Sequence, residues 1–129
     1  MTAVQYRPVA GCAPCTHRQA GDYHHRWLVV DENNHWLTTE AAAALSRVTT
    51  DLKMGYLVLR APGMLRMDIP LDVIEDDDSV VRQATVVGQN FAVVDEGDLA
   101  AVWFGHVTGK TCRLVKVHPD AAPIQWPAD

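Results

Sequence analysis

One stretch of this sequence says most about the fold: Val93-Val94-Asp95-Glu96-Gly97-Asp98-Leu99-Ala100-Ala101-Val102-Trp103. A strand-like apolar run meets an acidic segment with a glycine, and a helix-forming segment follows. Four apolar residues then recur at helical spacing, namely Leu99, Val102, Trp103 and Val107. This spacing predicts a helix over about 98–107 whose apolar stripe faces the core.

Both ends of this predicted helix carry boundary signals. Asp95 or Asp98 can cap its first turn, where acidic groups also favour the positive end of the helix dipole. Gly109 suits the residue after the helix, because glycine adopts the left-handed conformation that closes a helix, and Lys110 lies beside the negative end. The apolar residues of 114–117 then predict a last strand.

Short strands dominate the rest of the chain. They are expected at Val4–Val9, Trp27–Val30, His35–Leu37, Val48–Thr50, Leu57–Leu59, Met67–Ile69, Thr85–Val87 and Phe91–Val94. Asp31–Asn34 and Gly88–Asn90 have the residues of hairpin turns. Thr38 or Thr39 can cap a short helix over Ala41–Leu45. The sequence therefore predicts a single, mainly β, barrel-like or α+β domain over residues 1–129, with one main helix and an irregular tail from about 119.

Length and composition fit one domain with an ordinary core. The 129 residues are 48% hydrophobic and 21% charged, with a net charge of −5. The most acidic run is Glu75–Asp78, and no basic stripe is present, so nucleic acid is not an expected partner. Met1–Tyr6 carries no leader-like pattern, and no apolar run is long enough to span a bilayer. These features predict a cytoplasmic protein.

Cys12-Ala13-Pro14-Cys15 is the most conspicuous local motif. A redox Cys-x-x-Cys pair needs a helix after the motif, because the helix N-terminus stabilises the first thiolate. Residues 16–21 are too few and too poorly patterned for such a helix. We therefore predict a turn between two strands, with three free thiols in a reducing compartment.

Metal binding and catalysis find little support in the remaining motifs. Cysteines and histidines cluster near the N-terminus, at Cys12, Cys15, His17, His24 and His25, but the second ligand pair of a structural zinc site is missing. Gly105–Thr111 resembles a phosphate-binding loop, yet it has three residues between its glycines where that loop has four. Ser46 and Ser79 are not flanked by the glycines that surround a catalytic serine nucleophile. The carboxylates of Asp76–Asp78 are contiguous, which is typical of a solvated loop and not of a paired acid and base. No catalytic residue or metal site is predicted.

The four tryptophans divide into two groups. Trp27, Trp36 and Trp103 fit apolar stripes and are expected in the core. Trp126 lies in the tail, where it can pack back on the domain or serve a partner surface.

Four stretches together resemble the MOSC N-terminal β-barrel domain. They are Tyr6–Cys12, Arg26–Asp31, Leu57–Met64 and Val93–Trp103, the last continuing to Cys112–Val115. The resemblance covers about 6–117. It implies a β-barrel fold. That domain normally precedes a MOSC domain in molybdenum-cofactor proteins such as the mitochondrial amidoxime reducing component, and the MOSC domain supplies the cysteine that binds molybdenum.

The resemblance also assigns positions to the phosphate of the molybdenum cofactor. In family members a lysine, a serine and arginines hold that phosphate, because it needs fixed cations and hydrogen-bond donors. In this sequence Ala10 occupies the position of the lysine, and Gly11 that of the serine. His24–His25, just before Arg26, replace an Asp-Arg pair, and Glu40 occupies the position of another arginine. Each lost charged contact costs a few kcal/mol, so the cofactor is not expected to bind to this chain on its own.

The candidate ligand-binding residues are Gly11, His25 and Arg26, at the corner that faces ligand and partner in the family. Arg26 would supply the permanent charge, and His25 a donor at acidic pH, since imidazoles protonate near or below about pH 6.5. The sequence predicts a non-catalytic binding or interaction domain that stands alone, with a separately encoded MOSC-domain protein as candidate partner. The alternative is an accessory subunit that completes a molybdenum-cofactor oxidoreductase with such a partner.

Overall fold

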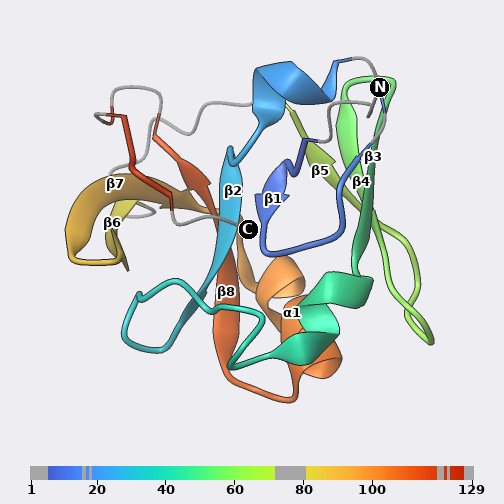
Figure 1. Cartoon of the computed structure of the whole chain (residues 1–129). Helices are drawn as coiled ribbons and strands as arrows, with labels where there is room; N and C mark the ends of the chain where they lie inside the picture. The colour runs from blue at the N-terminus through green and yellow to red at the C-terminus, as the bar shows by residue number, and fades with distance from the viewer. Residues whose placement is uncertain are drawn as a thin grey trace.

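The described part of the chain forms two β-sheets and one α-helix (Figure 1). The structure is a computed structural model and describes residues 6–15, 17, 19–71, 81–118, 121 and 123–126. The larger sheet has the order β1-β2-β8-β7-β6. Its strands are β1 (Val9–Ala10), β2 (Trp27–Asp31), β6 (Val81–Val86), β7 (Gln89–Asp95) and β8 (Cys112–Val117). The smaller sheet contains β3 (Thr49–Lys53), β4 (Tyr56–Arg60) and β5 (Met67–Pro70), in that order.

The larger sheet is antiparallel except at one edge. β1 runs parallel to β2, with Val9 level with Trp27, and β8 lies between β2 and β7. Residues 27–30 of β2 are fully buried. Both faces of this sheet are therefore covered, which explains why β2 is a continuous apolar run and does not alternate.

The segment after β2 links β2 to β6, the strand at the far edge of the larger sheet. Val30 and Trp36 form an antiparallel bridge, the Trp36 N–H donates to the Thr85 carbonyl over 2.9 Å, and the Thr85 N–H donates to the Asn34 carbonyl over 2.9 Å. These bonds join β2 to β6 and curl the sheet into a barrel-like form. The barrel cluster inside it comprises Ala10, Leu28, Val30, Ala84, Val86, Phe91, Val93 and Val115. The predicted hairpin is thus present, but its second arm makes isolated bridges and does not form a full strand.

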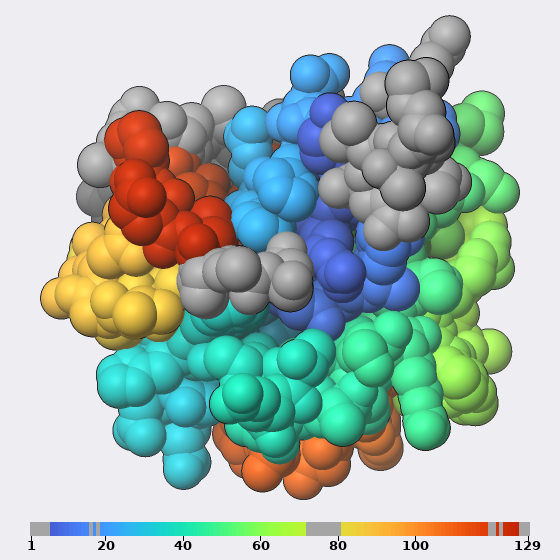
Figure 2. Space-filling view, viewed as in Figure 1, coloured from blue at the N-terminus to red at the C-terminus, as the bar shows by residue number. Residues whose placement is uncertain are grey.

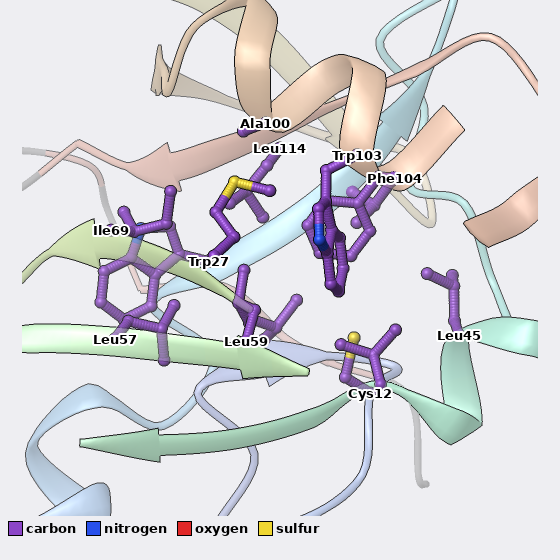
Figure 3. Packing of buried hydrophobic residues seen from close by; sticks show 14 of the residues in the cluster. Cys12, Trp27, Leu45, Leu57, Leu59, Ile69, Ala100, Trp103, Phe104 and Leu114 are labelled. Atoms are coloured by element: carbon purple, nitrogen blue, oxygen red, sulfur yellow. The ribbon is translucent and has the colours of Figure 1, made fainter. Parts of the chain in front are cut away.

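The main helix, α1 (Asp98–Thr108), packs between the two sheets on a second core (Figure 3). Trp103 and Phe104 lie in edge-to-face contact, with ring centroids 4.9 Å apart. Leu57 and Leu59 of β4 and Trp27 of β2 belong to the same buried cluster. The predicted helix and the mainly β fold are confirmed.

The predicted buried stripe of α1 is wrong at two of its four positions. Leu99 is 79% exposed and Val102 is 57% exposed, whereas Ala100, Trp103 and Phe104 are buried. Residues 99–104 are all apolar, so the spacing alone does not fix which side faces inward. The core selects the face that carries the two large aromatic rings.

The capping prediction for α1 is right at one end. Gly109 adopts the left-handed conformation, with φ 70°, at the carboxyl end. At the amino end neither Asp95 nor Asp98 is the cap, because Gly97 occupies that position with φ 104°. Asp95 instead accepts a hydrogen bond of 2.8 Å from the Gly97 N–H and so fixes the residue before the helix.

Three other predictions differ in detail. The short helix expected over 41–45 is a 3-10 helix at Ala43–Arg47 without a side-chain cap, and the strand expected over 48–50 is β3. The first strand is confined to β1, and Val4 and Gln5 lie outside the described residues, as does the acidic run Glu75–Asp78. Among the described residues, no helix has the length and hydropathy needed to cross a bilayer.

Candidate functional site

A tight turn follows β1 and places Gly11 at its apex. Gly11 has φ 91°, which lies in the left-handed region that favours glycine. The Cys12 N–H donates to the Val9 carbonyl over 3.1 Å and closes the turn. A Cβ at Gly11 would lie 3.9 Å from the Trp36 indole nitrogen and 4.0 Å from Thr39, so steric room exists but the backbone conformation disfavours a side chain.

This turn borders a cavity of about 340 Å³, called here the Gly11 pocket. Its described lining is Arg7, Gly11, Thr39, Ala43 and Ser46. The Arg7 guanidinium donates from Nη1 to the Cys12 carbonyl over 2.7 Å, which holds the cation beside the glycine turn. The Ser46 hydroxyl donates to the Ala43 carbonyl over 2.8 Å. A fixed guanidinium beside hydroxyl groups is the kind of donor set that binds an oxyanion.

The predicted residues His25 and Arg26 lie at the other end of β1. The parallel register places Arg26 level with Pro8, three residues before Gly11, which is roughly 10 Å along the strand at about 3.3 Å per residue. The His25 N–H donates to the Arg7 carbonyl over 2.8 Å, and the Arg7 N–H donates to Nδ1 of His24 over 2.9 Å. The corner is therefore joined to the backbone of Arg7, whereas the Gly11 pocket contains its side chain.

The side chains of this corner have specific contacts of their own. Arg26 donates from Nη2 to the Asp22 carbonyl over 3.3 Å, and its guanidinium lies 5.9 Å from the centroid of the Tyr23 ring. The rings of His24 and His25 are stacked with centroids 3.8 Å apart, and the His25 ring contacts Trp126 at 4.7 Å. Asp22 and Tyr23 belong to a 3-10 helix at Ala20–Tyr23 just before the corner.

Sequence comparison identifies the domain type. The profile of the MOSC N-terminal beta barrel domain matches residues 8–111. The chain belongs to this family. The zebrafish (Danio rerio) molybdenum cofactor sulfurase is 31% identical over 101 residues, which are 76% of this chain and 12% of that protein. The mitochondrial amidoxime reducing component 2 of Rattus norvegicus is 31% identical over 91 residues, which are 70% of this chain and 26% of that protein. The chain thus spans between 12% and 26% of the length of these curated relatives.

A solved structure shows the same arrangement over nearly the whole chain. The solution structure of a protein from Bordetella bronchiseptica is 51% identical and superimposes with a TM-score of 0.84. The similarity covers 99% of this chain and 98% of that one. The barrel-like fold inferred for this MOSC N-terminal domain is therefore shared by a protein of closely similar sequence.

The cysteine pair of this MOSC N-terminal domain lies in the core. Cys12, Cys15 and Cys112 are buried free thiols, and the Cys15 N–H donates to the Tyr6 carbonyl over 2.7 Å. Burial raises the pKa of Cys12 to about 12, although the charge of Arg7 opposes the rise. A thiol in this state is a poor nucleophile and a poor metal ligand. Cys12–Cys15 follows β1 as a connecting segment, as predicted, but the next element is the 3-10 helix Ala20–Tyr23 and not a strand. Within the described residues, no group of three or more potential ligand side chains could hold a metal.

Sequence reasoning missed two charged groups inside the MOSC N-terminal domain. Trp27 donates from its indole nitrogen to Glu96 over 2.9 Å, and the Lys116 amine lies 5.3 Å from the centroid of the Trp27 ring and donates to the Leu71 carbonyl. Burial raises the pKa of Glu96, while the Trp27 hydrogen bond and the Lys116 charge oppose the rise. The pairing of β8 with β2 brings Lys116 to Trp27, and the pairing of β8 with β7 brings Glu96 to them, so no local sequence motif indicates this contact.

Arg7 is the second omission, and it bears directly on the candidate site. It stands in the first stretch that resembles the family, but nothing in its spacing indicates a ligand contact. The Gly11 turn brings the Cys12 carbonyl within reach of its guanidinium. A cation four residues before the turn glycine is the only local signal that could have suggested this role.

Proposed function

We propose that this chain is a non-catalytic binding domain that holds a small oxyanion, such as a phosphate group, in the Gly11 pocket. The observation that carries this proposal is the Arg7 guanidinium, fixed on the Cys12 carbonyl beside the left-handed Gly11 turn. Thr39 and Ser46 add hydroxyl oxygens to the same lining. His25 and Arg26 form a second possible contact region, which would serve a larger anion.

The residues of this pocket fit a small anion better than the molybdenum cofactor. The position of the family lysine is Ala10, which is fully buried in the barrel cluster, so a cation does not project from it. Glu40, at the position of a family arginine, is exposed and negatively charged. Among the described lining residues, Arg7 is the one cation. We therefore assign no step of cofactor chemistry to this chain.

The proposal is tested by titrating isotopically labelled full-length chain with inorganic phosphate and then with pyrophosphate. Amide shifts are expected at Gly11, Cys12 and Thr39 at both acidic and neutral pH, because the guanidinium stays protonated throughout. Additional shifts at His25 and Arg26 that grow at acidic pH would assign the corner to the same site. Shifts scattered over the surface, or none, would exclude the proposal.

Two variants separate the pocket from the corner. Arg7→Gln removes a charge-assisted contact, which is worth about 1.5–3 kcal/mol and so predicts a loss of about tenfold or more in phosphate affinity. Arg26→Gln is the matched control, and its effect on inorganic phosphate is expected to be much smaller. A larger loss of phosphate affinity in Arg26→Gln than in Arg7→Gln would assign the anion site to the His25–Arg26 corner.

An accessory role is the second candidate, favoured by the similarity to the amidoxime reducing component. In this alternative the chain completes a molybdenum-cofactor oxidoreductase with a separately encoded MOSC domain. Mixing the full-length chain with such a domain tests it. A complex on gel filtration that retains molybdenum would support the accessory role, and separate elution would contradict it.

A further inference from the structure

The tail of the chain crosses the barrel-like sheet and covers part of it. Ala121, Ile124 and Trp126 pack against the barrel cluster. Figure 2 shows the tail, in red, lying against the yellow tip of the β6–β7 hairpin. Residues 123–126 carry no helix or strand. The described residues of the tail therefore lie without regular secondary structure on the apolar barrel cluster.

Gln89 holds this segment by its main chain. Its side-chain amide donates from Nε2 to the Gln125 carbonyl over 2.7 Å, and its Oε1 accepts a bond of 2.8 Å from the Gln125 N–H. Both bonds engage backbone groups, and Gln125 is exposed. A glutamine amide used in this way mimics the edge of a strand, and it binds a peptide whatever side chain stands at that position.

Trp126 provides the side-chain specificity. Its ring meets Trp36 edge-on at 5.1 Å and His25 at 4.7 Å. Trp36 and the backbone of His25 are held by hydrogen bonds that do not involve the tail. The Trp36 N–H donates to Thr85, its indole nitrogen donates to the Ala10 carbonyl over 3.4 Å, and the His25 N–H donates to Arg7. Trp36 and His25 thus form an aromatic site on the folded domain, and the Trp126 ring of the tail occupies it.

We propose that this surface, the tail groove, is a docking site for an extended peptide with an aliphatic residue two positions before a tryptophan. The tail is its built-in occupant. The groove is formed by Gln89, His25, Trp36 and the adjoining barrel cluster, and it shares none of the lining residues of the Gly11 pocket, although His25 also belongs to the His25–Arg26 corner. A tethered occupant acts at an effective concentration on the order of millimolar, so a partner peptide binds well only when the tail is weakened.

The test uses the full-length Trp126→Ala variant and a fluorescent synthetic peptide with the sequence of residues 121–126. The peptide is expected to bind this variant at least about tenfold more tightly than the wild-type chain, because a tryptophan packed between aromatic rings is a typical binding hot spot. The same peptide with alanine in place of tryptophan is expected to show no measurable binding. Equal binding to variant and wild type, or equal binding of the two peptides, would overturn the proposal.

Two further variants keep the test independent of folding. Adding Gln89→Ala to Trp126→Ala is expected to weaken peptide binding, whereas adding Gln125→Ala is the matched control and leaves it unchanged, because only its backbone is engaged. If Trp126→Ala does not fold, as judged by its amide spectrum, Ile124→Ser opens the same groove. Failure of the peptide to bind Ile124→Ser more tightly than wild type then decides against the groove.

Discussion

Cys12 shows how a residue that looks reactive in the sequence becomes inert in the fold. Its side chain is fully buried, and burial raises the pKa of the thiol to about 12. At about pH 8 roughly one molecule in ten thousand would carry the thiolate at this position. We expect no reaction of Cys12 with a thiol reagent such as Ellman's reagent in the native chain. All three cysteines should react after unfolding in guanidinium, and rapid native labelling of Cys12 would contradict the buried placement.

The charged carboxylate of Asp95 stabilises the folded domain through two arginines. Its side chain is 6% exposed, and its Oδ2 meets Arg82 Nε at 2.9 Å and Arg113 Nε at 2.5 Å. Burial alone would raise the pKa of Asp95, but the hydrogen bonds from Arg113 and Gly97 and the two arginine charges outweigh it, so the pKa is lowered. The resulting stabilisation is present above the ordinary carboxyl range and is lost as the pH falls through the lowered value.

Asp95→Asn should therefore destabilise the domain in a pH-dependent way. We expect a loss of about 2 kcal/mol at neutral pH, because hydrogen bonds to charged groups are worth roughly 1.5–3 kcal/mol. The difference from wild type should narrow as the pH falls below about 4. Urea melts at several pH values measure it. Asp98→Asn is the control, since Asp98 also contacts Arg113 but its side chain is 93% exposed. A constant difference for Asp95→Asn at every pH would refute the electrostatic explanation.

At the scale of the element, α1 buries the aromatic rings of Trp103 and Phe104 on one face and exposes Leu99 on the other. Trp103 is 7% exposed, and its indole nitrogen donates to the Leu65 carbonyl over 2.7 Å. Trp103→Ala should cost about 3–5 kcal/mol, as for other large-to-small core changes. Leu99→Ala, one turn away on the exposed face, should change stability by less than about 0.5 kcal/mol. Denaturant melts of the two variants check both values, and similar losses would mean that the helix is rotated.

The same helix separates what local sequence determines from what packing determines. Its bounds and its Gly109 end follow from turn chemistry, which acts over a few residues, and both were predicted. Its rotation about its own axis depends on the shape of the opposing sheets, so Leu99 and Val102 were placed wrongly. Most strands were recovered from the same local signals, although the first is confined to β1 and His35–Leu37 makes only isolated bridges. The Arg7 contact and the Gln89–Gln125 hydrogen bonds were missed, because the Gly11 turn and the packing of the tail create them.

At the scale of the whole molecule, three positions that the family resemblance assigns to the cofactor phosphate carry no cation. Buried Ala10, Gly11 and acidic Glu40 stand at the positions that the family resemblance assigns to phosphate contacts. We expect the purified full-length chain to contain no stoichiometric molybdenum. Elemental analysis measures this directly. A molar equivalent of molybdenum that survives gel filtration would show that other groups compensate for the missing cations.

The central position of β8 also has a consequence for biosynthesis. β8 is the last strand among the described residues, yet it pairs with β2 on one side and with β7 on the other. β2 emerges from the ribosome early, and apart from its bridge to Trp36 it has no antiparallel partner until Cys112–Val117 has been translated. Pairing across so much chain is slow, because the loop must close before any contact forms. The larger sheet should therefore assemble in one late step, after β8 has been translated, and the apolar residues of β2 are the surface that a chaperone would have to shield until then.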